Sequence, residues 1–242
     1  MAHVSKISGG LCLAFFLLAL ALTPASAVFT SFSVGLNDGG GACNYKGDFR
    51  DSPFFNGGLT AYIPQSQYNG GKGCGTCYEV SCKNHKSCRG GSVTVRAVGK
   101  QGNGDFLLSS TAWDKIVRDR AAGRVEIKYR GVECPSNGTF AVRVMPGSNP
   151  YWFAIQILGV VDAVEKVEIS KDASSWTSLR AMGESATWVL GSGAEKIVGV
   201  GRTVSVRVTE VAQAGQQLVL QLVNVIPAKW SAGTTYEYTV VI

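Results

Sequence analysis

Six of the seven cysteines constrain this chain more than any other feature, because they lie within residues 43–134 and none lies in residues 135–242; the seventh, Cys12, belongs to the predicted signal and leaves with it. The six are Cys43, Cys74, Cys77, Cys82, Cys88 and Cys134. An even number of cysteines in a secreted chain predicts disulfides, here three, although the sequence alone does not choose among the possible pairings. We therefore expect a cross-linked first half and a second half held together by packing alone.

The first 27 residues read as a secretion signal. His3 and Lys6 give a polar, basic start, Leu11–Leu22 is apolar, and small residues lead up to Ala27. The apolar stretch is shorter than the roughly 20 residues that span a bilayer. We predict cleavage after Ala27, an extracellular location and no membrane contact in the mature chain.

Part of the cysteine-rich segment also resembles a zinc site, because Cys74, Cys77, Cys82 and Cys88 crowd around His85. An oxidising compartment favours disulfides over free thiolates, which also removes a redox reading of the Cys-x-x-Cys pair. We expect neither a metal nor another cofactor.

The formal net charge of +6 is spread along the chain without a long run of Lys or Arg. This pattern does not indicate a nucleic-acid partner. Two explanations stay open at this point: weak attraction to an acidic extracellular matrix, and simple solubility.

The first half reads as a β domain with one helix. Glycine is dense over residues 35–104, which predicts tight turns between short strands. One helix is predicted over residues 109–121, capped by Ser109 or Ser110. Strands rich in β-branched and aromatic residues are predicted at 77–82, 92–98, 105–109, 124–132 and 139–145.

The composition changes after the Gly/Ser/Asn/Pro-rich stretch at residues 145–150. Alternating strands follow at 152–158, 163–170, 205–211 and 217–226, which is typical of a small antiparallel β-sandwich. The predicted organisation is a signal at 1–27, a first domain at 28–145, a linker at 146–150 and a second domain at 151–242.

Few residues in the chain could carry catalysis. His85 is the only histidine after the signal and lies between cysteines expected to be bridged, so a Ser/His/Asp or Cys/His centre is not expected. Glycoside hydrolysis needs two carboxylates across a cleft. The first half offers Asp38, Asp48, Asp51, Glu79, Asp105 and Asp114. Composition therefore permits hydrolysis without indicating it.

Large aromatic residues in the second half allow two interpretations. Tyr151-Trp152 opens a predicted strand, and Trp188 lies in a later one. Such rings either fill a core or lie flat on an open face, where they can stack on sugar rings. The pattern alone does not decide between the core and the platform.

Four stretches carry a resemblance to a known family: GGACNYKG at 40–47, GKGCGTCYEVSCKN at 71–84, KYRGVEC at 128–134 and IPAKWSAGTTYEY at 226–238. In their order and spacing the chain resembles the plant expansin superfamily, most closely the expansin-like A and B branches. The resemblance implies a mainly β protein. Its first domain would be a six-stranded double-psi β-barrel related to family 45 glycoside hydrolases, and its second an immunoglobulin-like sandwich that binds cellulose and other wall glucans.

The resemblance also implies a disulfide pairing and a partner. The pairs would be Cys43–Cys74, Cys77–Cys134 and Cys82–Cys88. The expected partner is a cell-wall polysaccharide, such as cellulose, xyloglucan or another glucan, bound by a monomer in the wall. Asn137-Gly-Thr is an acceptor sequence for N-glycosylation.

The resemblance places Thr30, Asp38 and Tyr45 in an open groove on the barrel, with Asp105 nearby. The family's His-Phe-Asp stretch reads Asp105-Phe106-Leu107 here, so leucine replaces the acid. Two residues along a strand is about 7 Å, whereas a general acid must lie within about 3 Å of its oxygen. We interpret Asp105 as a strand-edge or turn acid.

A second family acid, in a Thr-Asp pair, is represented by Arg96-Ala97. With both acids absent, we expect no enzyme activity.

In the second domain the resemblance favours Trp152 and Trp188, with Tyr151 beside them, as exposed rings for glucan stacking. Trp176 is left between binding and packing, and Trp230 is assigned to the core. The leading hypothesis is a non-enzymatic wall protein. The alternatives are an endo-β-glucanase that uses Asp38 with Asp105, and a barwin-like defence or ligand-binding module.

Overall fold

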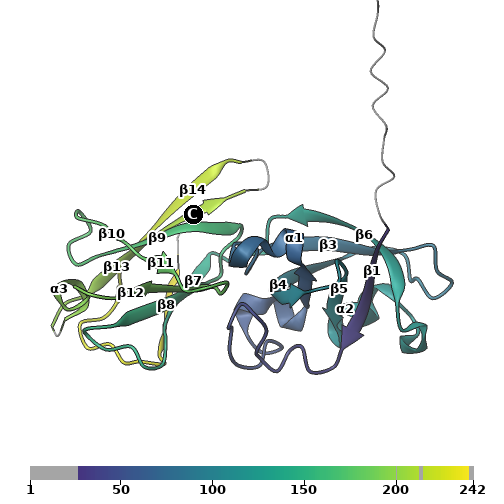
Figure 1. Ribbon diagram of the computed structural model, residues 1–242, viewed down its shortest axis with the longest axis horizontal. Coiled ribbons are helices and arrows are strands. Elements are labelled where there is room, and N and C mark those ends of the chain that lie inside the picture. Colours follow the sequence, from purple (N-terminus) through teal and green to yellow (C-terminus); the bar gives the residue numbers. More distant parts are fainter. Residues whose placement is uncertain (1–26, 200, 213–214, 240–242) are drawn as a thin grey trace, which may run out of the picture.

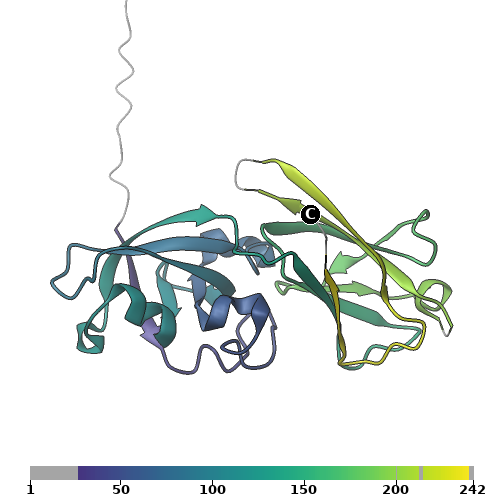
Figure 2. The same ribbon diagram turned by 180° about the vertical axis from the view of Figure 1, so that it is seen from behind.

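Two β units lie side by side along the long axis of the molecule (Figure 1), and the view from behind shows the same arrangement (Figure 2). The computed structural model describes residues 27–199, 201–212 and 215–239. The predicted signal lies outside these residues except for its last member, Ala27. Within the described ranges, no helix has the length and apolar character needed to cross a membrane.

The first unit is a closed six-stranded barrel in the order β1-β5-β2-β4-β3-β6, as expected for a double-psi barrel. The pairs β1–β5 and β2–β4 are parallel, and the other neighbours are antiparallel. The strands are β1 Val28–Ser33, β2 Thr60–Pro64, β3 Cys77–Lys83, β4 Val93–Gln101, β5 Phe106–Ser109 and β6 Val125–Val132. The barrel unit also holds η1 Pro53–Gly58, α1 Gln65–Tyr68, η2 Asn69–Gly71, α2 Ser110–Ile116 and η3 Arg120–Ala122.

The predicted helix forms, but it is shorter than residues 109–121. Ser109 caps α2 by accepting a hydrogen bond from the Ala112 backbone N–H. Trp113 and Ile116 are buried in the barrel core. The helix ends at Ile116 because Val117 adopts an extended conformation and forms an antiparallel bridge with Cys88.

The disulfides form as the resemblance implied: Cys43–Cys74, Cys77–Cys134 and Cys82–Cys88. Their Cα–Cα separations are 5.5, 5.0 and 5.4 Å, within the usual range for a bridged pair. The zinc alternative is therefore wrong, because the four cysteines it needs are all bridged.

The second unit is a sandwich of two antiparallel sheets around a separate apolar core. One sheet has the order β10-β9-β13-β14 and the other β11-β12-β8-β7-β15. The strands are β7 Thr139–Val144, β8 Phe153–Leu158, β9 Ala163–Ser170, β10 Thr177–Ser178, β11 Arg180–Ala181, β12 Thr187–Leu190, β13 Val204–Val211, β14 Gln217–Ile226 and β15 Thr235–Thr239, with a short helix α3 Glu195–Val198.

The predicted domain boundary at residues 145 and 146–150 is wrong by one strand. β7, assigned from the sequence to the first domain, pairs with β8 and β15 inside the five-stranded sheet. The error arose because β7 precedes the Gly/Ser/Asn/Pro-rich stretch, which is the hairpin between β7 and β8. The chain passes from barrel to sandwich earlier, in residues 133–138.

Cys134 attaches this connection to both units. Cys134 is bridged to Cys77 of the barrel, and its backbone N–H donates to the Val161 carbonyl, 2.9 Å away, on the sandwich side. Asn137, the predicted glycosylation acceptor, lies exposed in the same segment, and its Oδ1 accepts from the Thr139 N–H. Asn137 is therefore accessible, and its occupancy stays a prediction.

A buried arginine joins the two units. Arg96 of β4 donates from Nη1 to the carbonyls of Gly75 in the barrel and Val160 in the sandwich, both at 2.8 Å. Burial lowers the pKa of this guanidinium. Glu210 of β13 is also buried, and its Oε2 accepts from the backbone N–H groups of Val161 and Asp162. Charged donors and acceptors thus hold the chain just after the connection.

We predict that Arg96→Met lowers the free energy of unfolding by roughly 2–4 kcal/mol, because methionine leaves both buried carbonyls without their donor. Urea unfolding followed by tryptophan fluorescence measures the change. Arg118→Met, at an exposed position, is the matched control and should stay within about 0.5 kcal/mol of the parent. Equal midpoints for the two variants would show that Arg96 does not join the units.

Candidate functional site

Asp105 is committed to structural contacts at the end of the barrel. One carboxylate oxygen accepts from the backbone N–H of Phe29 at 3.2 Å. The other accepts from Asn103 at 3.4 Å and from Arg124 at 2.9 and 3.2 Å. Its side chain is 13% exposed. This arrangement ties β1 to the start of β5, which agrees with the strand-edge interpretation.

Leu107 lies in a row of side chains on the outer surface of the barrel. The register places Ser31 of β1 beside Leu107 of β5, Leu107 beside Tyr62 of β2, and Tyr62 beside Gly99 of β4. The neighbours of Leu107 in sequence, Phe106 and Leu108, point into the core instead. The row therefore presents a hydroxyl, an aliphatic side chain and a phenol at the level where the family acid was expected, and no carboxylate.

The predicted barrel groove is largely wrong, because three of its four members, Thr30, Tyr45 and Asp105, are buried. Thr30 is 1% exposed and Tyr45 is 2% exposed. Burial raises the pKa of the Tyr45 phenol to about 12, so the hydroxyl stays protonated. Asp38 alone is open, with its side chain 60% exposed. Thr30 instead points into the barrel, and Tyr45 packs on Phe55 where the barrel meets the sandwich.

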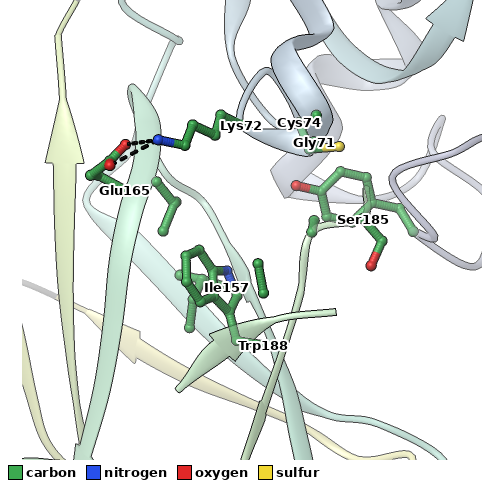
Figure 3. Close-up of a pocket in the computed structure, with 12 residues that line it drawn as sticks. Gly71, Lys72, Cys74, Ile157, Glu165, Ser185 and Trp188 are labelled. Carbon is green, nitrogen blue, oxygen red and sulfur yellow. Dashed lines mark hydrogen bonds and ion pairs between the residues drawn. The ribbon is translucent and has the colours of Figure 1, made fainter. Parts of the chain in front are cut away.

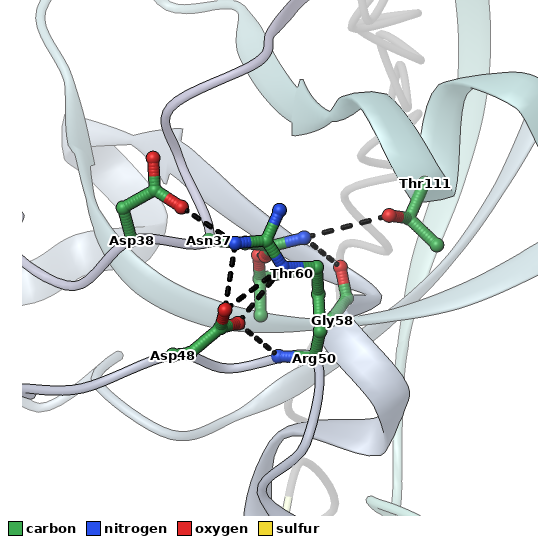
Figure 4. Close-up of polar contacts among 7 residues, drawn as sticks. All are labelled: Asn37, Asp38, Asp48, Arg50, Gly58, Thr60 and Thr111. Atoms are coloured by element: carbon green, nitrogen blue, oxygen red, sulfur yellow. Dashed lines mark hydrogen bonds and ion pairs between the residues drawn. The ribbon is translucent and has the colours of Figure 1, made fainter.

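Asp38 is held in an ion-pair cluster on the barrel surface (Figure 4). The Arg50 guanidinium pairs with Asp38 at 2.9 Å and with Asp48 at 2.6 Å. Its hydrogen bonds lower the pKa of Asp48. Beneath this cluster the buried side chain of Asn37 accepts from Thr60 Oγ1 at 2.6 Å and donates to the Gly58 carbonyl at 3.0 Å. Asp38 and Asp105 thus belong to separate sets of contacts.

The two tryptophans of the predicted platform lie on opposite faces of one sheet. Trp188 pairs with Ile155, and both side chains contribute to the core between the sheets. Trp152 packs instead with Ala154, Val189 and Met145, a cluster separate from that core. The expectation of one continuous platform is therefore wrong, because side chains in strands alternate between faces.

A turn presents Tyr151 and Trp152 at the start of β8. The Asn149 side chain accepts from both of their backbone N–H groups, at 2.9 and 3.1 Å, and the Asn149 N–H donates to the Trp152 carbonyl at 2.8 Å. Tyr151 is 72% exposed and Trp152 is half-buried. Trp152 lies on the outer face of the five-stranded sheet, and Tyr151 precedes it in the turn.

The outer face continues from Trp152 toward the barrel. Gln156, four residues or about 13 Å further along the extended chain, donates to the carbonyls of Cys43 and Asn44 in the barrel. Between them lies a shallow hollow that includes Met145, Arg143 and Lys46. We call Tyr151, Trp152, Met145, Arg143 and Lys46 the outer strip.

The outer strip carries positive charge that its neighbours do not neutralise. Among the described residues, neither Arg143 nor Lys46 forms an ion pair. Arg143 donates to the Lys46 carbonyl at 3.1 Å and to Thr235 Oγ1 at 3.2 Å, and burial lowers its pKa. The sequence prediction missed both residues. The alternation of β7 could have placed Arg143 on the face opposite the core residues Val142 and Val144.

A cavity of about 290 Å³ lies between the barrel and the end of the sandwich (Figure 3). Tyr45 lines its barrel side, and Trp188 and Ile157 line its sandwich side. Lys72 of the barrel pairs with Glu165 of β9, with 2.9 Å from Nζ to each carboxylate oxygen. The rest of the lining is Gly70, Gly71, Cys74, Val164, Ala181, Ser185 and Ala186.

The remaining tryptophans are accounted for by packing. Trp176 stacks on the Arg207 guanidinium, 4.4 Å from its ring centre, in the region of the four-stranded sheet. Trp230 packs against the sandwich core and donates from its indole N–H to the Val198 carbonyl at 2.9 Å. Among the described residues, no cluster of His, Cys, Asp or Glu could hold a metal ion.

Comparisons with known proteins agree with this architecture. Residues 60–129 match a family model described as lytic transglycolase, which covers most of the barrel. A Clavibacter michiganensis expansin, solved as a mutant in complex with cellohexaose, superposes with a TM-score of 0.66 at 22% identity, covering 88% of this chain and 95% of that one. At that identity, the likeness extends to the fold.

Two plant relatives establish the family. Expansin-B11 of Oryza sativa subsp. japonica is 32% identical over 234 residues, covering 88% of this chain and 76% of the relative. Expansin-like A2 of Arabidopsis thaliana is 32% identical over 230 residues, covering 89% of this chain and 82% of the relative. With this identity over most of a chain whose barrel unit carries the three expected disulfides, the chain belongs to the expansin superfamily.

Proposed function

We propose that this protein is a secreted, non-hydrolytic cell-wall protein that binds wall polysaccharide along the outer strip. The observation that carries the proposal is the half-buried Trp152 on the outer face of the five-stranded sheet, with the exposed Tyr151 beside it in the turn, on a face that continues to the barrel. Aromatic faces stack on the C–H-rich faces of sugar rings. Along the same strip the Lys46 and Arg143 side chains can donate hydrogen bonds to hydroxyl or carboxylate oxygens.

We propose that the protein does not hydrolyse glycans, because of the contacts that Asp105 and Asp38 make and the leucine at residue 107. Glycoside hydrolysis needs a proton donor within hydrogen-bond reach of the scissile oxygen and a second carboxylate across the cleft. Asp105 already accepts from Phe29, Asn103 and Arg124, and Asp38 is paired with Arg50 in a different cluster. Leu107 occupies the outer barrel row where a carboxylate would be needed.

Binding would act on the wall by competition. A polymer segment that lies on Trp152 and reaches the barrel exchanges contacts with a neighbouring polymer for contacts with the protein. Because no covalent bond is cut, the change reverses when the protein leaves. The relative solved with cellohexaose supports a linear glucan as ligand class for that protein, and we extend it to this chain by proposal.

Trp152→Ala should reduce retention on insoluble cellulose several-fold, because it removes a ring that contributes considerable area to a stacked contact. A pull-down on cellulose, xylan and pectin, with depletion measured across protein concentration, gives the change. Trp176→Ala is the matched control, since Trp176 stacks on Arg207 near the other sheet. Equal retention of parent and Trp152→Ala on every polymer would reject the outer strip as the binding surface.

Asp105→Asn should lower the free energy of unfolding by about 1 kcal/mol, because it weakens the contact to the half-exposed Arg124. It should not change polymer retention. Parent and variant should both release no new reducing ends from soluble β-glucan. Asp114→Asn, another acid paired with an arginine on the barrel, controls for loss of a surface ion pair. Reducing ends released by the parent and abolished in Asp105→Asn would instead establish the endo-β-glucanase alternative.

A further inference from the structure

The cavity between the barrel and the sandwich has the size and the lining of a small binding site. Its volume of about 290 Å³ lies at the lower end of the range for small-molecule sites, roughly 300–1,000 Å³. It lies on the inner-face side of the five-stranded sheet, reached by Trp188 and Ile157. It is therefore separate from the outer strip, which lies on the other face.

The lining combines an aromatic wall with polar groups at its edge. Figure 3 shows the Lys72–Glu165 pair on one side, Ser185 on the other, and Trp188 with Ile157 between them. The Lys72 and Glu165 side chains are 53% and 46% exposed, so both can also contact a ligand. An indole with hydrogen-bonding groups at its margin is the arrangement that suits a sugar ring, which has apolar faces and a polar rim.

The charge of the lining favours a neutral ligand. Lys72 and Glu165 neutralise each other, and the other lining residues are uncharged at neutral pH, including Tyr45. An anionic sugar would gain nothing from the pair as a whole, whereas hydroxyl groups can donate to Glu165 and accept from Lys72. This distinguishes the cavity from the outer strip, where Lys46 and Arg143 form no ion pair within the described residues.

We propose that this cavity binds a single neutral pyranose unit at the end, or on a side branch, of a wall oligosaccharide. The volume does not accommodate a run of several sugar rings, so the interior of a glucan chain does not fit. The inference rests on the proposed function only for the choice of carbohydrate as ligand class. The cavity differs from the outer strip in its position, its residues and the form of ligand that it binds.

Ala181 gives a direct way to close the cavity. It lies on β11 opposite Trp188, so their side chains share a face, and it lines the cavity while remaining exposed. A leucine there would cover the indole without entering a packed core. Ala181→Ser keeps the space open at the same position and serves as the matched control.

The test is calorimetric titration of the full mature protein with cellohexaose, which supplies chain ends, and with a xylose-branched glucan oligosaccharide, which also supplies branches. Tryptophan fluorescence is followed in parallel. For at least one of the two oligosaccharides we expect one ligand per protein at the cavity, with its affinity reduced about tenfold or more in Ala181→Leu and Trp188→Leu. Ala181→Ser should keep the parent affinity, and so should Trp176→Ala, which changes a ring near the other sheet.

The inference is overturned if the parent binds neither oligosaccharide, or if folded Ala181→Leu binds like the parent. An unchanged unfolding midpoint shows that Ala181→Leu is folded. The test therefore stands on Ala181→Leu even if Trp188→Leu does not fold. Retention on cellulose that depends on Trp152 would then still support the proposed function. Loss of soluble binding together with no Trp152-dependent retention would reject both.

Discussion

The disulfide between Cys43 and Cys74 is the constraint on which the relation between the two units depends. It joins the loop that carries Tyr45 and Lys46 to the segment that follows η2. The Cys43 carbonyl accepts from the Ala186 N–H at 3.1 Å and from Gln156 Nε2 at 3.4 Å, both in the sandwich. A cross-link over 31 residues limits the unfolded chain and fixes the barrel surface on which the sandwich packs.

Further contacts across the junction come from charged and polar groups. Glu184 of the sandwich forms an ion pair with Lys100 and accepts from the Tyr68 hydroxyl through its carbonyl. Lys72 and Glu165 add a second ion pair. The buried Arg96 reaches carbonyls on both sides. Because exposed pairs contribute little on their own, the buried donors carry most of this stabilisation.

Much of the fold could be predicted from the sequence, and the site much less. Runs of β-branched residues located β3, β4, β6, β8, β9, β13 and β14, and the family resemblance gave the disulfide pairing. The boundary failed at β7, because a turn-rich stretch looks the same whether it separates domains or closes a hairpin. Asp105 was expected to be a strand-edge or turn acid, but its partner Arg124 could not be predicted, since that contact depends on tertiary packing.

The tryptophans show most plainly where sequence reasoning stopped. The alternation of side chains along residues 152–155 puts 152 and 154 on one face and 153 and 155 on the other, and the sequence alone predicts this. Whether a face meets the core or the solvent, however, depends on the other sheet. Trp188 pairs with Ile155 on the core side, so its ring faces the sandwich interior and the cavity, and Trp152 faces outward. The burial of Thr30 follows in the same way from barrel closure, and that of Tyr45 from its position where the barrel meets the sandwich.

Cys134 ties the connection between the units to the barrel by a covalent bond and to the sandwich by a backbone hydrogen bond. These contacts restrict rotation of one unit relative to the other, which many tandem modules allow. A stiff tandem holds whatever it grips at a set spacing and angle. When a ligand bound to one unit is displaced, the other unit moves with it, because the spacing between the units is fixed.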